Sequence, residues 1–372
     1  MFQINRQFLS LVSASLLLGS VSISPSFESA QAVTPSSIAQ SSDAEALFKL
    51  GDAMYVNKDY RRAIAAYNEA IRLNPNYVEA YNNRGIAKYE LGDKKSAIAD
   101  YSKAIRLNPT YAFIYYNRGL AKYDLGDIQG ANSDYTEAIR INQNWENITL
   151  DNAYHNRGTA KYDLGDKKGA IADYSEAIRL NPNYDDAYYG RGIAKDDLGD
   201  KKGAIADYSE AIRLNPNYAD AYYNRGIVKD DLGDKKGSIA DYSEAIRLNP
   251  NYADAYYNRG IVKDGLGDKQ GAIADYSEAI RLNPNYDDAY YGRGIAKDDL
   301  GDKQGAIADY SEAIRLNSNY ADAYYNRGIV YMQLDATQKA LADYRAAARL
   351  YQQQNKMSDY DDAQQRIREL GG

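Results

Sequence analysis

The chain has 372 residues, of which 44% are hydrophobic and 26% charged, and its net charge is −7. This apolar content is too high for a disordered chain, and the acidic balance argues against nucleic-acid binding, which needs a basic face against the phosphates. There is no cysteine and only one histidine, His155. Disulfides, thiolate nucleophiles, zinc–thiolate sites and polyhistidine metal sites are therefore excluded.

Residues 1–32 have the pattern of an export signal. Arg6 is followed by an apolar stretch, residues 8–23, and by Ala-Gln-Ala at 30–32, which fits the small-x-small cleavage rule. The apolar stretch is shorter than a membrane span, which needs about 20 mostly apolar residues. The alternatives to a cleaved signal are an uncleaved membrane anchor and an apolar tail that arose by chance. We expect residues 1–32 to be a cleaved signal peptide that exports the protein to the bacterial periplasm, the cell envelope or the medium. No membrane span is expected after cleavage, and residues 33–43 are predicted to be a polar linker.

A glycine that follows arginine recurs along the chain at a regular interval, i to i+34. Its members are Gly85, Gly119, Gly158, Gly192, Gly226, Gly260, Gly294 and Gly328, with one longer interval after Gly119. Gly51 precedes Gly85 by the same regular interval and opens a more divergent first copy. We therefore predict nine copies and one insertion: 44–77, 78–111, 112–145, insertion 146–150, 151–184, 185–218, 219–252, 253–286, 287–320 and 321–354. Below, positions are numbered 1 to 34 within each copy.

The fifth copy has the pattern of two helices joined by a tight turn. Its first half ends at Leu198-Gly199-Asp200. Glycine just past a helix end accepts the left-handed conformation, and aspartate is a favoured N-cap for the next helix. The second half carries apolar residues at helical spacing and stops before Pro216, because the residue before proline avoids the α region. Each copy is thus predicted to be a pair of helices of about 14 residues.

This unit resembles the tetratricopeptide repeat, a 34-residue helix–turn–helix. In the fifth copy the family's recurrent positions are held by Tyr188, Gly192, Ala204, Tyr208, Ala211 and Pro216. The resemblance covers residues 44–354 and is specific, because these positions recur together in nine copies. It implies an all-α, right-handed superhelical solenoid of nine repeats. It also implies a concave groove that is lined by the first helix of each copy (helix A) and in which partners of the family usually bind.

Two irregular segments follow from the same alignment. The third copy ends in Trp145 where seven of the other copies have tyrosine, and the insertion 146–150 comes next, so we expect an irregular joint with a longer turn there. After the last copy, Ala363, Ile367 and Leu370 fall at i, i+4 and i+7, the spacing of an amphipathic helix. Because a solenoid needs a terminal cap with a polar outer face, we expect residues 355–372 to be a capping helix.

Position 7 departs from the family pattern, because arginine stands where leucine is usual. An arginine in a packing position needs a partner, and an aspartate recurs at i+16, which is position 23. We expect each arginine to pair with an aspartate of its own or of the adjacent copy; the alternative is that the arginines extend to solvent. The arginines are Arg84, Arg118, Arg157, Arg191, Arg225, Arg259, Arg293 and Arg327, and the aspartates are Asp100, Asp134, Asp173, Asp207, Asp241, Asp275, Asp309 and Asp343.

The resemblance places the candidate partner-binding residues at positions 2, 5 and 6 of helix A. They are Asp186, Tyr189, Asp220, Tyr223, Asn224, Asp254, Tyr257, Asn258, Asp288, Tyr291, Asp322, Tyr325 and Asn326. The same groove would contain the acidic residues at positions 12 and 13: Asp196, Asp197, Asp230, Asp231, Asp264, Asp298 and Asp299. Carboxylates beside tyrosines suit a basic or amphipathic ligand. The alternative is a solvated face whose residues were merely copied by tandem duplication.

The sequence does not favour catalysis. His155 stands alone, so we expect a contact or surface residue there rather than a catalyst. Neighbouring carboxylates such as Asp196 and Asp197 diverge by about 100° on a helix and do not face each other as an acid–base pair would. Neither a phosphate-cradling glycine loop nor the spacing of a calcium loop is present. We expect no enzyme activity, no cofactor and no metal.

The predicted function is that of an exported protein–protein interaction scaffold, whose groove binds another protein or a peptide with basic character. Two other functions fit the same residues. The protein could be a structural, self-associating envelope protein, or an accessory module for polysaccharide export whose tyrosine and aspartate groove binds a glycan. A mass that rises with concentration would favour self-association, and binding of a neutral sugar that is insensitive to salt would favour the glycan.

Overall fold

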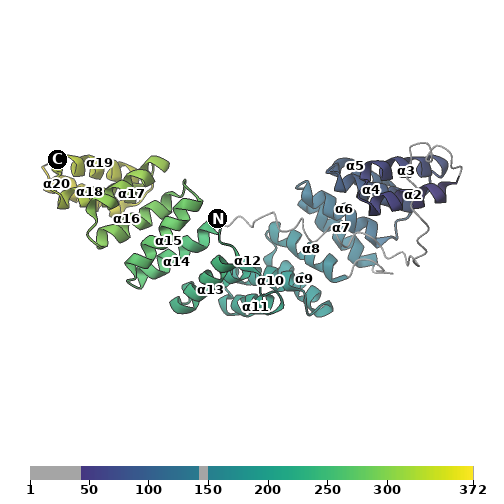
Figure 1. The fold of residues 1–372 in the computed structure, drawn as a ribbon, viewed down its shortest axis with the longest axis horizontal. Helices are drawn as coiled ribbons and strands as arrows, with labels where there is room; N and C mark the ends of the chain where they lie inside the picture. Colours follow the sequence, from purple (N-terminus) through teal and green to yellow (C-terminus); the bar gives the residue numbers. More distant parts are fainter. Residues whose placement is uncertain (1–42, 142–149, 372) are drawn as a thin grey trace. The chain divides into compact units, whose positions relative to one another are not determined.

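The computed structural model describes residues 43–141 and 150–371, and every element in these two ranges is an α-helix (Figure 1). The chain divides after Asp200 into two compact units. The predicted signal peptide, most of the linker and most of the joint around Trp145 lie outside the described residues. Within the described ranges the predicted all-α fold of repeated helix pairs is confirmed.

The first unit consists of consecutive antiparallel helix pairs, and each helix contacts the next. Its helices are α2 (Ala44–Val56), α3 (Tyr60–Leu73), α4 (Val78–Glu90), α5 (Lys94–Leu107), α6 (Ala112–Asp124), α7 (Ile128–Ile141), α8 (Leu150–Asp163), α9 (Lys167–Leu180) and α10 (Asp185–Asp196).

The second unit continues the same alternation and ends with one unpaired helix. Its helices are α11 (Lys201–Leu214), α12 (Ala219–Asp231), α13 (Lys235–Leu248), α14 (Ala253–Gly265), α15 (Lys269–Leu282), α16 (Asp287–Asp299), α17 (Lys303–Leu316), α18 (Ala321–Gln333), α19 (Thr337–Gln353) and α20 (Met357–Glu369). In both units helix A carries positions 1 to about 13, and the second helix of a copy (helix B) begins at position 17.

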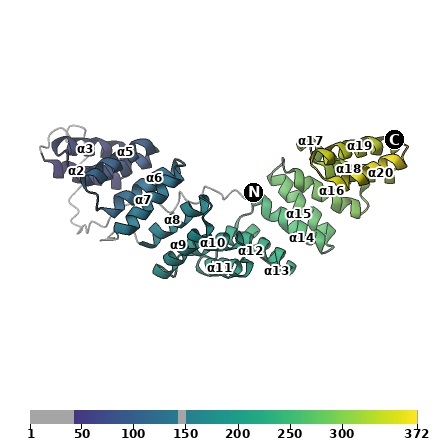
Figure 2. The same ribbon diagram turned by 180° about the vertical axis from the view of Figure 1, so that it is seen from behind.

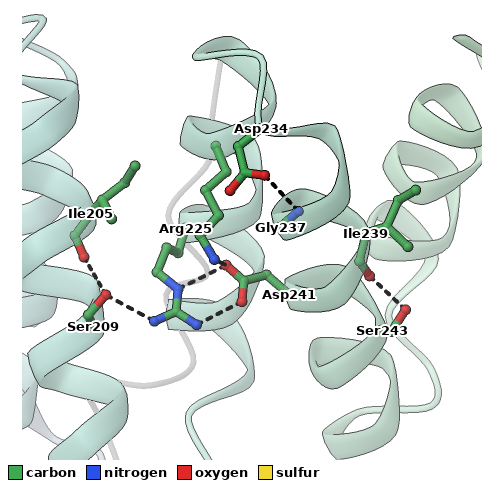
Figure 3. A network of polar contacts seen from close by, with 9 residues as sticks. Ile205, Ser209, Arg225, Asp234, Gly237, Ile239, Asp241 and Ser243 are labelled. Carbon is green, nitrogen blue, oxygen red and sulfur yellow. Dashed lines mark hydrogen bonds and ion pairs between the residues drawn. The ribbon is translucent and has the colours of Figure 1, made fainter. Parts of the chain in front are cut away.

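The turn inside each copy is built as the sequence predicts. Gly233 lies in the left-handed region with φ of 84°, as does Gly199 of the fifth copy. The side chain of Asp234 then accepts a hydrogen bond of 3.0 Å from the backbone N–H of Gly237 (Figure 3), which satisfies one of the unpaired donors at the start of α13. Glycine therefore lets the chain reverse, and aspartate starts helix B.

Small residues let the two helices of a copy approach closely. The tyrosine at position 24 of helix B lies directly on the glycine at position 8 of helix A. In the seventh copy, a Cβ on Gly260 would lie 2.9 Å from the ring of Tyr276, which is too close for a side-chain carbon. Ala272 and Ala279 on the same helix B are fully buried. The interior of each pair is thus one aromatic ring set among alanines and a glycine.

Arginine at position 7 is held by the aspartate at position 23 of its own copy. Arg225 donates hydrogen bonds of 2.8 Å from Nε and 2.7 Å from Nη2 to the carboxylate of Asp241, and Lys229 lies 2.8 Å from the same carboxylate (Figure 3). The remaining Nη1 donates to the hydroxyl of Ser209 in the preceding copy at 2.9 Å. The guanidinium of Arg225 therefore joins the two helices of its own copy and also contacts the copy before it.

The Arg–Asp pairing predicted from the sequence is confirmed for seven copies. The pairs are Arg84–Asp100, Arg118–Asp134, Arg157–Asp173, Arg225–Asp241, Arg259–Asp275, Arg293–Asp309 and Arg327–Asp343. The alternative, in which these arginines extend to solvent, is wrong for these seven.

The first copy lacks all three charged groups of this network together. Position 7 is Leu50, position 11 is Met54 and position 23 is Ala66, and both Met54 and Ala66 are buried. A copy can therefore be packed with an apolar set in place of the arginine, lysine and aspartate.

The C-terminal helix closes the second unit. Ala363 and Ile367 of α20 are buried in a cluster with Ala347 and Leu350 of α19, and α20 lies beside α19 in both ribbon views (Figures 1 and 2). Its opposite face is exposed and carries Asp361 among other polar residues. The predicted capping helix is thereby confirmed.

Candidate partner-binding face

The candidate residues of the second unit form one recurring cluster in each copy. In the seventh copy the hydroxyl of Tyr286, at position 34, donates a hydrogen bond of 2.9 Å to the carboxylate of Asp254 at position 2. The ring of Tyr286 in turn lies 4.8 Å, between centroids, from the ring of Tyr257 at position 5. We call this cluster of positions 2, 34 and 5 the Asp–Tyr–Tyr module.

The same module occurs in all four complete copies of the second unit. The hydrogen bond from tyrosine to aspartate measures 2.8 Å in copy 6, 2.7 Å in copy 8 and 2.7 Å in copy 9. In copy 9, Gln354 stands at position 34 and α19 is longer, so that Tyr351 supplies the hydroxyl. The further modules are Asp220–Tyr252–Tyr223, Asp288–Tyr320–Tyr291 and Asp322–Tyr351–Tyr325.

The tyrosine at position 5 is less accessible than the sequence suggests. Tyr223 is 8% exposed, with its ring 5.8 Å from Tyr242 and 4.7 Å from Tyr252. Burial raises the pKa of Tyr223, Tyr257 and Tyr291, to about 12 for Tyr291, so these three phenols remain neutral at physiological pH. Their rings form the floor of the face and support the carboxylates above them.

The carboxylates at position 2 are the accessible part of the module. Asp254 and Asp288 are exposed, whereas Asp220 and Asp322 are half-buried. Burial raises the pKa of Asp220, and the hydrogen bond from Tyr252 opposes that rise. A partner would therefore meet a row of aspartates first and the tyrosine edges second.

The candidate asparagines at position 6 connect neighbouring copies. The side-chain amide of Asn258 donates to the hydroxyl of Tyr223 in the preceding copy at 2.9 Å, and Asn326 donates to Tyr291 at 2.9 Å. In copy 8 the position is Gly292, and a Cβ there would lie 2.9 Å from the ring of Tyr276. These asparagines therefore support the tyrosines within the chain.

Three further candidate residues lie outside the modules. Asp186 and Tyr189 are half-buried on α10 of the first unit, and Asn224 is half-buried on α12 of the second. Asp186 and Tyr189 occupy positions 2 and 5 of their copy, and Asn224 occupies position 6 of its copy.

Six of the acidic residues at positions 12 and 13 form ion pairs with lysines near the turns. Lys269, at position 17, lies 3.0 Å from Asp264 of its own copy and 2.6 Å from Asp299 of the next. The structure shows the same pairing of a position-17 lysine with Asp197, Asp230, Asp231 and Asp298. The excess negative charge near the tyrosines therefore resides at position 2.

Two contacts were not predicted from the sequence, although their residue spacings were visible in it. One joins the position-17 lysine to an aspartate of the next copy, and the other joins the position-2 aspartate to the position-34 tyrosine. The position-13 aspartate of the next copy stands at i+30 from the position-17 lysine, as in Lys269 and Asp299. The position-34 tyrosine stands at i+32 from the position-2 aspartate, as in Asp254 and Tyr286. Each of these spacings recurs in four copies, whereas the i, i+16 spacing of the Arg–Asp pair recurs in eight.

The single histidine is a core contact of the first unit. His155 is 8% exposed, and its ring lies 5.5 Å from the ring of Tyr174 and 4.9 Å from that of Tyr184. Burial lowers the pKa of the imidazole, against the opposing charges of Asp186 and Asp151. The neutral form is therefore favoured in the folded chain.

The described ranges contain neither a cluster that could hold a metal ion nor a helix that could cross a membrane. In residues 43–141 and 150–371 there is no group of three or more His, Asp or Glu side chains that could hold a metal ion. Within the same ranges, none of the helices combines the length and the apolar character that a membrane crossing requires.

Models of the TPR repeat match residues 57–92, 87–126, 158–199, 197–233, 231–267 and 298–335, which together make up more than half of the chain. Models of the tetratricopeptide repeat also match residues 114–144, 253–286 and 321–354. The chain belongs to the tetratricopeptide repeat family. Tetratricopeptide repeats form scaffolds that are suited to protein–protein interaction, and the family is typically non-catalytic.

Solved structures of other tetratricopeptide repeat proteins share this fold. The C-terminal part of a repeat-containing protein from Cytophaga hutchinsonii is 21% identical, with a TM-score of 0.55, and the match covers 66% of this chain and 98% of that one. A tetratricopeptide repeat protein from Parabacteroides merdae is 20% identical, with a TM-score of 0.50 and coverage of 68% and 98%. YrrB, described as a TPR protein with an unusual peptide-binding site, is 22% identical over 52% of this chain and 97% of its own, with a TM-score of 0.46. No curated protein sequence matches the chain.

Proposed function

We propose that the protein is an exported scaffold that binds a basic segment of another protein on the helix-A face of its second unit, meaning the side formed by the four Asp–Tyr–Tyr modules. The observation that carries this proposal is the row of accessible carboxylates at position 2. Asp254 and Asp288 are exposed, and each lies beside a pair of tyrosines whose rings contact each other at a tilt.

Accessible carboxylates on aromatic rings favour cationic and amphipathic ligands. The negative charge accelerates encounter with a basic partner and makes binding sensitive to salt. The rings offer a large contact area at a low cost in conformational entropy. Because the rings are already held by Asn258 and Asn326, this face is organised before a partner arrives.

The proposal of export is supported by the signal-like pattern of residues 1–32. N-terminal sequencing of the protein from an envelope fraction should give a mature start at Val33. A protein that begins at Met1 and remains with the cytosolic fraction would contradict export and leave the binding proposal intact.

The binding proposal is tested by affinity capture with charge-reversed variants. The exposed carboxylates are better targets than the tyrosines, since Tyr223 and its equivalents also hold the fold together. The full chain carrying Asp254→Lys and Asp288→Lys would be immobilised beside the native chain, and envelope extract passed over both. The matched control is Glu278→Lys with Glu312→Lys, which changes the charge equally on the B helices of the same copies.

A protein that binds the native chain and the control, that is lost by the aspartate variant and that is released by moderate salt would support the proposal. Equal recovery by all three chains would overturn it. Recovery of the chain itself alone, with a mass that rises with concentration in light scattering, would favour the self-associating alternative instead.

A further inference from the structure

The last Asp–Tyr–Tyr module is already occupied by a cation from the chain itself. Lys356, which precedes α20, places its Nζ 3.4 Å from the carboxylate of Asp322 and 5.7 Å from the ring centroid of Tyr351. The segment that leads into the capping helix thus supplies one positive group to the carboxylate and the ring of copy 9.

The three preceding modules have the same composition but no such cation. Asp220, Asp254 and Asp288 each accept a hydrogen bond from their tyrosine through one carboxylate oxygen. Among residues 201–371, no lysine or arginine forms an ion pair with these three carboxylates. In copies 6, 7 and 8 each of these carboxylates therefore keeps a second oxygen for which residues 201–371 supply no ion-pair partner, and this oxygen can bind a cation from outside the chain.

A primary ammonium fits this arrangement for two reasons. The carboxylate supplies an opposite charge, and the face of the neighbouring ring attracts a cation through its quadrupole. The long apolar stem of lysine can also lie along the tyrosine edges while its charged end meets the carboxylate. Copy 9 holds Lys356 through the first two of these contacts.

We propose that the modules of copies 6, 7 and 8 each bind a lysine side chain of the partner, as the module of copy 9 holds Lys356, and that the partner is a lysine-rich segment. This inference rests on the proposed function and specifies the ligand group. Successive A helices of the second unit contact each other, and packed helices lie about 8–10 Å apart. A polyproline II chain advances about 3.1 Å per residue and has three residues per turn, so lysines at every third position lie on one side and match consecutive modules.

The test uses the full chain and a fluorescent peptide with lysine at every third residue, separated by glycine and serine. Asp220→Asn, Asp254→Asn and Asp288→Asn together should weaken its binding at least tenfold, while each asparagine oxygen still accepts the hydrogen bond from tyrosine. The matched control is Glu244→Gln, Glu278→Gln and Glu312→Gln, which removes the same charge from the B helices of the same copies and should change the affinity less than twofold. Thermal melts of both variants check the fold.

Two further arms address the ligand group and the occupied module. The same peptide with acetylated lysines should not bind detectably, because acetylation removes the charge. Lys356→Ala should tighten binding of the lysine peptide two- to fivefold, since it opens the fourth module. Equal weakening by both triple variants, binding of the acetylated peptide, or no gain from Lys356→Ala would each overturn the inference.

The inference and the proposed function fail differently. If Asp254→Lys with Asp288→Lys abolishes capture of an envelope protein while the lysine peptide does not bind, the helix-A face binds a partner by other chemistry. The lysine proposal alone would then be wrong.

Discussion

The carboxylate of Asp275 receives two hydrogen bonds from the guanidinium of Arg259, of 2.9 Å from Nε and 2.7 Å from Nη2. Lys263 lies 2.8 Å from the same carboxylate, and the aspartate side chain is only 5% exposed. One buried carboxylate thus interacts with two cations between helices α14 and α15. The network stabilises the pair of helices only while it is complete.

We expect Asp275→Ala to lower the free energy of unfolding by about 3 kcal/mol, because two partly buried cations lose their partner. The triple variant Arg259→Leu, Lys263→Met and Asp275→Ala recreates the apolar set of the first copy, and should cost about 1 kcal/mol or less. Urea unfolding followed by circular dichroism measures both. A triple variant as unstable as the single one would show that the first copy's packing does not transfer.

Two glycines of α14 should respond to alanine in opposite directions. Gly260→Ala forces a methyl group onto the ring of Tyr276 and should destabilise by about 1–3 kcal/mol. Gly265 has no neighbour within 4 Å of its Cβ position, so Gly265→Ala should stabilise by about 0.5–1 kcal/mol through helix propensity alone. Thermal melts of the two single variants compare the effects directly, and shifts of the same sign would contradict this account.

The stability of the first unit should fall as the pH drops below the ordinary histidine value of 6.5. Burial lowers the pKa of His155, so the unfolded chain takes up its proton at a higher pH than the folded chain does. The free energy of unfolding then decreases with falling pH by up to about 1.4 kcal/mol per pH unit. This is the window between the two pKa values, in which most carboxylates are still ionised.

The substitution His155→Tyr is the control for that pH dependence. Tyrosine occupies the same position in copies 3 and 5 to 9 and does not titrate between pH 5 and 7. Urea unfolding at pH 5.5 and 7.0 should differ in the native chain more than in the variant. An equal difference in both chains would assign the effect to other groups.

The capping helix should protect the end of the array locally. Ile367 is buried against α19, so Ile367→Ala is expected to cost about 2–4 kcal/mol, whereas the exposed Arg368→Ala should be near neutral. Because repeat arrays are stabilised by neighbouring contacts, hydrogen exchange should accelerate first in α19 and α20. Uniform acceleration along the whole second unit would show that the array unfolds as a single body.

The sequence predicts the helix pairs and the Arg–Asp network because these features depend on spacing within one copy. Gly233 and Asp234 determine where one helix ends and the next begins, and the i, i+16 spacing of Arg225 and Asp241 connects facing positions of one helix pair. Such contacts recur wherever the repeat recurs, so that nine copies reveal what one copy alone would not.

The accessibility of the candidate site could not be predicted in the same way. Lys269 pairs with Asp299 of the next copy, and Asn258 supports Tyr223 of the previous one, so the environment of each residue depends on how copies stack. A count of charges cannot distinguish Asp264, which forms an ion pair with a lysine, from Asp254, which accepts a hydrogen bond from a tyrosine. The burial of Tyr223 and His155 likewise follows from rings contributed by helices that are distant in the sequence.

The bond between Arg259 and Ser243 of the preceding copy has a consequence for the length of the array. Arg225, Arg259 and Arg293 each contact a serine at the same position of the copy before them, so this contact is the same at all three junctions. If one of these copies were removed, an arginine would face a serine equivalent to its former partner. The array can therefore change its length by whole copies while this contact between neighbouring copies is kept.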